Sequence, residues 1–321
     1  MGTTRRSFFG TVGAATAAVA MPGTPKPAEV RSGPRFYVPS VTPCERTGRF
    51  DEGLYKDMMP FFKERGADGV VVLGTTGEFA SFAVAERKKI AETALKHRAG
   101  LEMIVHVGAS NLPETLELLS HAAAHGADAA LCVPPFYFKN PRLEGLVAYF
   151  SRVLETARIP VYLYHIPAAS GVPITSELLR SLERYPRLAG IKDSSGNAEG
   201  YANFVREFPK LNIMTGTDNN LEAALQAGKS AILGSGHLLT RQIAAVFAAR
   251  RQGKDVAEPL ARLKEASQVM RGTGLGSLAA IKYALGGLGL RESYVRPPQV
   301  DLTPEQKAQL KPKLAQVAAL T

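Results

Sequence analysis

Short apolar runs alternate with longer amphipathic stretches along the chain from residue 36 onward. Runs of four to seven apolar residues have the length of buried strands. Apolar strands that alternate with helices favour a parallel sheet whose strands are joined by crossover helices. The expected strands are residues 36–42, 69–73, 103–107, 129–133, 160–164, 188–192, 212–215 and 230–233.

The longer stretches carry helical periodicity, for example at residues 84–97, 113–125, 143–157 and 176–183. Eight strand-and-helix units fit a (β/α)8 TIM barrel, which needs about 250 residues. An open doubly wound sheet is the alternative, but no Gly-x-Gly-x-x-Gly motif opens a helix after the first strand. The expected fold is therefore an α/β barrel over residues 36–252.

Helical patterns continue after the eighth unit, at residues 256–270, 278–288 and 304–319. They predict a C-terminal helical domain over residues 253–321 that packs against the barrel as an appendage.

The N-terminus has the features of an export signal over residues 1–21. Arg5 and Arg6 give a charged start, an apolar Ala- and Gly-rich stretch follows, and residues 18–20 offer a small-residue cleavage site. The arginine pair resembles a twin-arginine signal, which predicts export to the periplasm. The alternative is a cytoplasmic chain with a frayed end. Residues 22–35 contain four prolines and are expected to form a linker.

The composition, with 45% hydrophobic and 21% charged residues among 321, excludes a wholly disordered chain. The net charge is +10, of which the first 35 residues contribute +4. The other basic residues are interspersed with acidic ones and form no stripe with aromatic residues, so no nucleic-acid partner is expected. Cys44 and Cys132 are too few for a disulfide framework and lack the spacing of a metal site.

Residues that could act in catalysis or substrate binding lie at the ends of the expected strands, where TIM barrels have their active sites. Residues 74–78 follow the second strand and residues 134–137 follow the fourth. Tyr164 ends the fifth strand, Lys192 ends the sixth, and residues 216–218 follow the seventh.

Lys192 is the centre of the predicted site, because an apolar strand precedes it. Burial disfavours the ammonium form, and a neutral amine can attack a ketone to form a Schiff base. The alternative is a lysine that reaches solvent or pairs with Asp193. Tyr164 and Tyr137 offer phenols for proton transfer. The hydroxyls of Thr75 and Thr76, together with backbone N–H groups, suit a carboxylate.

Three motifs resemble those of the dihydrodipicolinate synthase / N-acetylneuraminate lyase family. They are Gly74-Thr75-Thr76-Gly77-Glu78, Tyr164-His165-Ile166-Pro167-Ala168 and Gly190-Ile191-Lys192-Asp193-Ser194-Ser195-Gly196. The resemblance runs from about residue 36 to Pro298 and includes Val295-Arg296-Pro297-Pro298. It implies a TIM barrel with a helical C-terminal domain, usually a homotetramer. It also implies a class I aldolase acting on pyruvate or pyruvate-yielding 2-keto acids, with no metal or organic cofactor because the imine is the electron sink.

The resemblance also implies a role for each residue at a matching position. Lys192 forms the Schiff base, and Tyr164 is the general acid and base. Thr76 binds the substrate carboxylate. Thr75 links Tyr164 to Tyr137, which reaches the neighbouring subunit's site. The other expected substrate-binding residues are Gly74, Gly77, Gly216, Asp218 and Ile232.

The substrate is less constrained than the chemistry. The synthase branch usually carries an arginine where this chain has Ala169, and losing that carboxylate clamp disfavours a dicarboxylate product. The stretch 166–171 is similar to sialic acid lyases, but His165, Asn219 and Gly234 depart from their pattern. These features favour a lyase for a 2-keto-3-deoxy sugar acid or a similar compound. The alternatives are 4-hydroxy-tetrahydrodipicolinate synthase, N-acetylneuraminate lyase and a non-catalytic exported sugar-acid binding protein.

A metal-dependent aldolase with histidine ligands is a further alternative. His121 and His125 have i,i+4 spacing, but no carboxylate motif accompanies them and they lie within a helix rather than at a strand end. No metal is therefore expected. His106 on the third strand and His237 after the eighth have open roles and are not assigned to the site.

Overall fold

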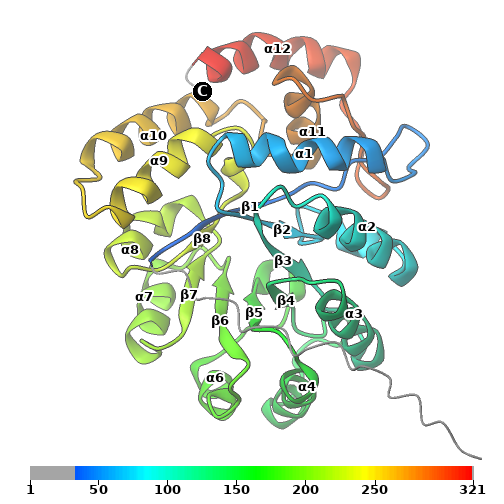
Figure 1. Ribbon diagram of the computed structural model, residues 1–321, viewed down its shortest axis with the longest axis vertical. Coiled ribbons are helices and arrows are strands. Elements are labelled where there is room, and N and C mark those ends of the chain that lie inside the picture. The colour runs from blue at the N-terminus through cyan, green and yellow to red at the C-terminus, as the bar shows by residue number, and fades with distance from the viewer. Residues whose placement is uncertain (1–32, 320–321) are drawn as a thin grey trace, which may run out of the picture. The chain divides into compact units, whose positions relative to one another are not determined.

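The computed structural model describes residues 33–319 and contains eight parallel strands that close into a barrel in chain order (Figure 1). Each strand pairs with the next, and β8 closes the barrel on β1. The strands are β1 (Phe36–Pro39), β2 (Gly69–Val72), β3 (Glu102–His106), β4 (Ala129–Cys132), β5 (Val161–His165), β6 (Leu188–Asp193), β7 (Asn212–Thr215) and β8 (Ala231–Ile232). All eight expected strands are confirmed, although β1 ends at Pro39 instead of residue 42 and β8 contains only two of the four residues expected.

Helices surround the barrel and cover its outer face (Figure 1). They are α1 (Glu52–Glu64), α2 (Val84–Lys96), α3 (Leu112–Ala124), α4 (Leu143–Thr156), α6 (Ser176–Leu182), α7 (Ala198–Glu207), α8 (Leu221–Gln226) and α9 (Thr240–Arg251). Polar side chains set where several of them begin: Asp51, Asn111, Thr175 and Asn197 each accept a hydrogen bond from a backbone N–H of the first turn. Short elements at the loops are α5 (Pro167–Ser170), η1 (Phe79–Ser81), η2 (Asp218–Asn220) and η3 (Gly234–His237).

Three more helices follow the barrel, namely α10 (Ala257–Met270), α11 (Leu278–Gly287) and α12 (Pro304–Ala319). The helix α10 packs against α9, and α12 packs against α10 and α11. The TIM barrel with helices after it is thus confirmed. The division at residue 252 stays a prediction, and the proposed signal over residues 1–21 lies outside the described residues. Within residues 33–319, no helix is long and apolar enough to cross a membrane.

Side chains alternate between the barrel interior and the helices, as the two-residue period of a strand requires. Tyr37, Val71, Ile104 and Met214 belong to one cluster inside the barrel. Their sequence neighbours on each strand pack in a second, larger cluster under the helices. Because Tyr164 belongs to the interior cluster, the alternation places it inside the barrel near the end of β5.

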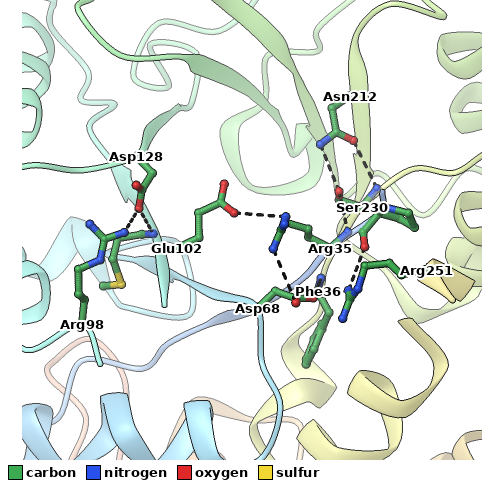
Figure 2. Close-up of polar contacts among 11 residues, drawn as sticks. Arg35, Phe36, Asp68, Arg98, Glu102, Asp128, Asn212, Ser230 and Arg251 are labelled. Atoms are coloured by element: carbon green, nitrogen blue, oxygen red, sulfur yellow. Dashed lines mark hydrogen bonds and ion pairs between the residues drawn. The ribbon is translucent and has the colours of Figure 1, made fainter. Parts of the chain in front are cut away.

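Charged and polar residues at the starts of the strands close the amino-terminal end of the barrel (Figure 2). The Arg35 guanidinium lies between Asp68 at 3.8 Å and Glu102 at 3.6 Å. Asp68 also accepts hydrogen bonds from Arg251 Nη1 at 2.8 Å and from the Phe36 backbone N–H at 3.0 Å. This end of the barrel is therefore held by paired charges.

Candidate active site

Lys192 and Tyr164 lie side by side at the carboxyl-terminal end of the barrel, on β6 and β5. Their Cα atoms are partners in the strand register. Lys192 Nζ donates a hydrogen bond to the Tyr164 hydroxyl at 3.2 Å and lies 4.2 Å from the centre of its ring. The Tyr164 hydroxyl is also 3.3 Å from Thr75 Oγ1. The structure brings together three of the four residues expected to be catalytic.

The pKa of Tyr164 reflects two opposing influences. Burial by itself raises the pKa of the phenol, but the charge of Lys192 and hydrogen bonds with Thr75, Lys192 and Ser194 hold the pKa of Tyr164 below its usual value. A phenol with a lowered pKa releases its proton more readily. That property suits a group that exchanges protons with a substrate hydroxyl.

Both alternatives considered for Lys192 from the sequence are wrong. The side chain does not reach solvent, because Lys192 is only 4% exposed. Asp193 is fully buried, accepts a hydrogen bond from the Ser195 backbone N–H at 2.8 Å and lies 4.0 Å from His165 Nε2. No ion pair joins Lys192 to any carboxylate within residues 33–319. Lys192 is therefore buried with the Tyr164 hydroxyl, and not a carboxylate, as its hydrogen-bond partner.

Backbone geometry fixes the threonine loop that follows β2. Leu73 and Glu78 flank the loop with φ of 59° and 53°, in the left-handed region that is costly for residues other than glycine. A Cβ at Gly77 would lie 2.9 Å from Leu73 Cα, so a side chain does not fit there. The Gly77 carbonyl accepts a hydrogen bond from the Thr42 hydroxyl at 2.8 Å. The loop is thus held in one shape.

A buried ion pair ties the same loop to the C-terminal helices. The Glu78 carboxylate lies 2.5 Å from Lys282 Nζ on α11 and accepts a hydrogen bond from the Arg296 backbone N–H at 2.9 Å. Lys282 in turn donates to the Tyr294 carbonyl at 2.6 Å. The motif around Arg296 was noticed in the sequence, but its link to the loop was missed because 218 residues separate the partners.

A cleft of about 550 Å³ opens beside Thr76 and contains three of the expected substrate-binding residues, Thr76, Gly216 and Asp218. The Asp218 carboxylate accepts a hydrogen bond from the Ser235 hydroxyl at 2.6 Å. A Cβ at Gly216 would lie 2.0 Å from Ser194 Oγ and 3.1 Å from Lys192 Cε. Glycine at this position therefore leaves room for the lysine side chain.

The remaining expected site residues lie in three places. Gly74 and Gly77 are buried in the threonine loop. Ile232 belongs to the interior cluster that contains Tyr164. Tyr137 lies on the surface loop after β4 and is 75% exposed. No hydrogen bond joins Tyr137 to Thr75 in the described part of the chain, so the link implied by the family stays a prediction.

His106 is a residue near the site that the sequence reading left unassigned. It is fully buried, and its ring centre lies 6.2 Å from that of Tyr164. Burial, assisted by the charges of Arg87 and Lys192, holds the pKa of His106 well below its usual value. The two-residue period from Ile104 was the signal for its inward orientation.

Two other histidines hold the scaffold. His165 Nδ1 accepts a hydrogen bond from the Ile174 backbone N–H at 2.9 Å. His237 Nε2 accepts one from the Val41 N–H at 3.2 Å, and its Nδ1 donates to the Gly234 carbonyl at 2.8 Å. One ring nitrogen of His165 and both ring nitrogens of His237 are thus hydrogen-bonded to the backbone.

One group of residues within 33–319 has donor atoms close enough together to hold a metal ion, namely Glu92, His121 and His125. No carboxylate motif accompanies the two histidines in the sequence, but Glu92 reaches them in space from the neighbouring helix α2. The group lies on α2 and at the end of α3 rather than at a strand end, in agreement with the placement expected for the histidines.

The profile of the Dihydrodipicolinate synthetase family matches residues 34–317. The chain belongs to this family. Its members are class I lyases and aldolases that make or break carbon–carbon bonds, and the predicted enzyme class is thereby confirmed.

Relatives of the chain show how wide the family is. An uncharacterized DapA-like lyase of Chloroflexus aurantiacus is 36% identical over 267 residues, which cover 81% of this chain and 89% of the relative. A 4-hydroxy-tetrahydrodipicolinate synthase of Neisseria meningitidis serogroup C is 32% identical over 280 residues, covering 85% and 95%. The solved structure of YagE, a prophage protein of this family from E. coli K12, contains pyruvate. It has a TM-score of 0.81 at 28% identity and covers 89% of this chain and 98% of YagE.

Proposed function

We propose that this protein cleaves a 2-keto-3-deoxy sugar acid, or a similar 2-keto acid, into pyruvate and an aldehyde through a Schiff base on Lys192. The observation that carries this proposal is the buried Lys192 amine, which bonds to the Tyr164 hydroxyl and has no carboxylate partner in residues 33–319. The pyruvate bound in YagE supports pyruvate as the keto-acid half of the substrate.

The reaction begins when Lys192 Nζ attacks the C2 carbonyl carbon of the substrate. Loss of water then leaves a protonated imine. Tyr164 removes the proton of the C4 hydroxyl, the C3–C4 bond breaks, and its electron pair moves through C3 into the imine. The products of this step are an aldehyde and an enamine. Protonation of C3 and hydrolysis of the imine release pyruvate and restore the amine.

The neighbouring residues have supporting roles in this proposal. Thr75 bonds to the Tyr164 hydroxyl and relays its proton. Thr76 lines the cleft and binds the substrate carboxylate through its hydroxyl and backbone N–H. Gly216 keeps the space beside Lys192 open. No metal or organic cofactor is required, because the protonated imine accepts the electron pair.

Two features of the site favour a polyhydroxylated substrate. Ala169 on α5 provides no guanidinium for a second carboxylate. The cleft has one guanidinium in its lining, that of Arg271, and it carries Asp218, Asn219 and Ser235, which offer hydrogen bonds suited to hydroxyl groups. The second candidate is condensation of pyruvate with aspartate semialdehyde. It is supported by the relatives named 4-hydroxy-tetrahydrodipicolinate synthase.

A substrate panel separates these candidates. Pyruvate release from 2-keto-3-deoxygluconate and N-acetylneuraminate is compared with condensation of pyruvate and aspartate semialdehyde. We expect kcat/KM for a sugar acid to exceed that for condensation by about 100-fold or more. The variant Ala169→Arg is expected to lower the ratio of kcat/KM for sugar-acid cleavage to kcat/KM for condensation. Efficient condensation without sugar-acid cleavage would overturn the proposed substrate, and binding without turnover of any compound would indicate a binding protein.

Tyr137 supports a proposed homotetramer. Tyr137 and its neighbour Phe138 are 75% and 73% exposed, and exposed aromatic pairs are typical of surfaces that a second copy covers. Light scattering on the full chain is expected to give the mass of a tetramer. Tyr137→Ala is expected to lower activity, because each active site would lose the phenol that the neighbouring subunit contributes. A monomer with full activity would contradict this assignment.

Export is proposed on the sequence of residues 1–21. Fractionation of cells that express the full chain is expected to place it in the periplasm. Replacement of both Arg5 and Arg6 by lysine is expected to retain it in the cytoplasm. Equal distribution of the two proteins would contradict a twin-arginine signal.

A further inference from the structure

Glu92, His121 and His125 converge on the outer surface of the barrel, where α2 packs against α3. His121 Nε2 lies 2.8 Å from Glu92 Oε1, and His125 Nε2 lies 3.8 Å from the same oxygen. All three donor atoms are within 4.8 Å of one another. If the three side chains moved slightly toward one another, these donor atoms would have the spacing of the ligands around a single small cation.

The two histidines are already oriented by the helix. Their i,i+4 spacing places them on adjacent turns, and their ring centres are 4.1 Å apart. His125 Nδ1 lies 2.9 Å from the His121 carbonyl oxygen, and a carbonyl can only accept. The proton of neutral His125 is therefore on Nδ1, and the lone pair of Nε2 faces Glu92. Metal-binding histidines are commonly fixed in this way by a bond from their second nitrogen to a carbonyl.

The carboxylate comes from a helix whose position is independently fixed. An ion pair between Lys88 of α2 and Glu117 of α3 joins the same two helices elsewhere along their length. Glu92 is therefore placed by helix packing rather than by the histidines alone. Lys89 is the other charged side chain that acts on the Glu92 carboxyl, in addition to the two histidines.

We propose that Glu92, His121 and His125 form a binding site for a divalent transition-metal ion of the zinc type, which joins α2 to α3. Two imidazole nitrogens and one carboxylate oxygen are three of the four ligands of tetrahedral zinc, and water fills the fourth position. Binding displaces the proton between His121 Nε2 and Glu92, and this proton passes to the solvent. Mg²⁺ and Ca²⁺ require several oxygen ligands and are excluded by this donor set.

The site is distinct from the lysine centre in position and role. Its ligands come from α2, from α3 and from the residue that follows α3, whereas Lys192 and Tyr164 lie on the barrel strands β6 and β5. The ion therefore stabilises the helix ring and takes no part in the aldolase chemistry.

Titration calorimetry on the tag-free full chain, treated beforehand with a chelator, tests this proposal. We expect one Zn²⁺ per chain with a Kd on the order of 10 µM, which is much weaker than a four-ligand structural zinc site. Mg²⁺ is expected to give no saturable heat. Zinc at about 100 µM is expected to raise Tm by about 3 °C and to leave kcat unchanged.

Three variants identify the ligands. His125→Ala and Glu92→Gln are expected to weaken zinc binding at least about tenfold. His97→Gln alters a histidine at the end of α2 that is outside the cluster, and it should bind zinc as the unaltered protein does. If a variant fails to fold, imidazole NMR of the unaltered protein replaces it, and zinc is expected to shift only the His121 and His125 signals. No saturable zinc binding, or shifts at other histidines, would overturn the proposal.

Discussion

Arg35, at the amino-terminal end of the barrel, lies between two carboxylates, whereas Lys192 at the carboxyl-terminal end has none within residues 33–319. Both side chains lie largely out of solvent in the same barrel. The network around Arg35 satisfies its charges and stabilises the fold (Figure 2). The surroundings of Lys192 give it a phenol instead of a counter-ion. The two ends thus separate stability from reactivity, as TIM barrels generally do.

This difference predicts opposite responses to mutation. Removing one member of a buried pair leaves its partner uncompensated, which is costly. Removing an unpaired amine leaves no buried charge behind. Substitutions at the amino-terminal end should therefore lower stability, and those around Lys192 should lower activity while stability is retained.

The largest effect is expected for Lys192→Met, which replaces the amine by an apolar side chain of similar length. We expect kcat to fall by at least about 10⁴-fold, because no nucleophile remains. Tm should stay the same or rise, because the buried polar group is gone. Pyruvate release and thermal unfolding are the measurements. A large fall in Tm would show that the amine also supports the fold.

Tyr164→Phe removes one hydroxyl beside the lysine and is expected to lower kcat by about 10³-fold, as loss of a general acid and base does. Tyr162 on the same strand provides a matched control. Tyr162 is partly buried against the same interior cluster, and burial raises the pKa of Tyr162 to about 12. Tyr162→Phe should leave kcat within about threefold, since it lies one strand period nearer the amino-terminal end. An equal loss of kcat in both variants would contradict a specific role for the Tyr164 hydroxyl.

Asp68→Asn tests the paired end. Asp68 accepts bonds from Arg251 and the Phe36 N–H and lies 3.8 Å from Arg35. We expect the free energy of unfolding to fall by about 3 kcal/mol, because Arg251 loses its carboxylate partner and Arg35 keeps only Glu102. The kcat of the folded enzyme should be unchanged. Asp57→Asn on the exposed face of α1 is the control. Its free energy of unfolding, measured by urea denaturation, should change by no more than about 0.5 kcal/mol.

The smallest effect concerns a buried histidine behind the cleft. Burial lowers the pKa of His237 to about 4, although its bond to the Gly234 carbonyl opposes the shift. The unfolded chain binds a proton near pH 6.5 while the native protein stays neutral, so stability is lost as pH falls toward 4. Between pH 7.5 and 5.0 we expect a loss of about 2 kcal/mol from this group.

The His237→Asn variant isolates that contribution. His106 and His165 remain in both proteins, so the difference between the two pH profiles of unfolding free energy belongs to His237. Parallel profiles would contradict the shift in its pKa.

The strands and the lysine centre were predictable because both depend on local patterns. The period of apolar residues placed Tyr164 and Lys192 at the ends of neighbouring parallel strands, and the register then made them partners. The same period points His106 inward, so its place near the site was also within reach.

Long-range polar contacts were not predictable in this way. The Glu78–Lys282 pair and the approach of Glu92 to His121 join segments whose sequence patterns specify helices or turns but not their partners. The expected role of Tyr137 depends on a second copy of the chain.

Borohydride trapping with pyruvate tests the central claim most directly. The protein is incubated with pyruvate, reduced, digested and mapped by mass spectrometry. We predict an adduct on Lys192 with the mass of pyruvate less one oxygen atom, absent in Lys192→Ala and retained in the control Lys139→Ala. A folded protein that gives no adduct, or that carries the adduct on another lysine, would contradict the assignment of Lys192 as the Schiff-base residue.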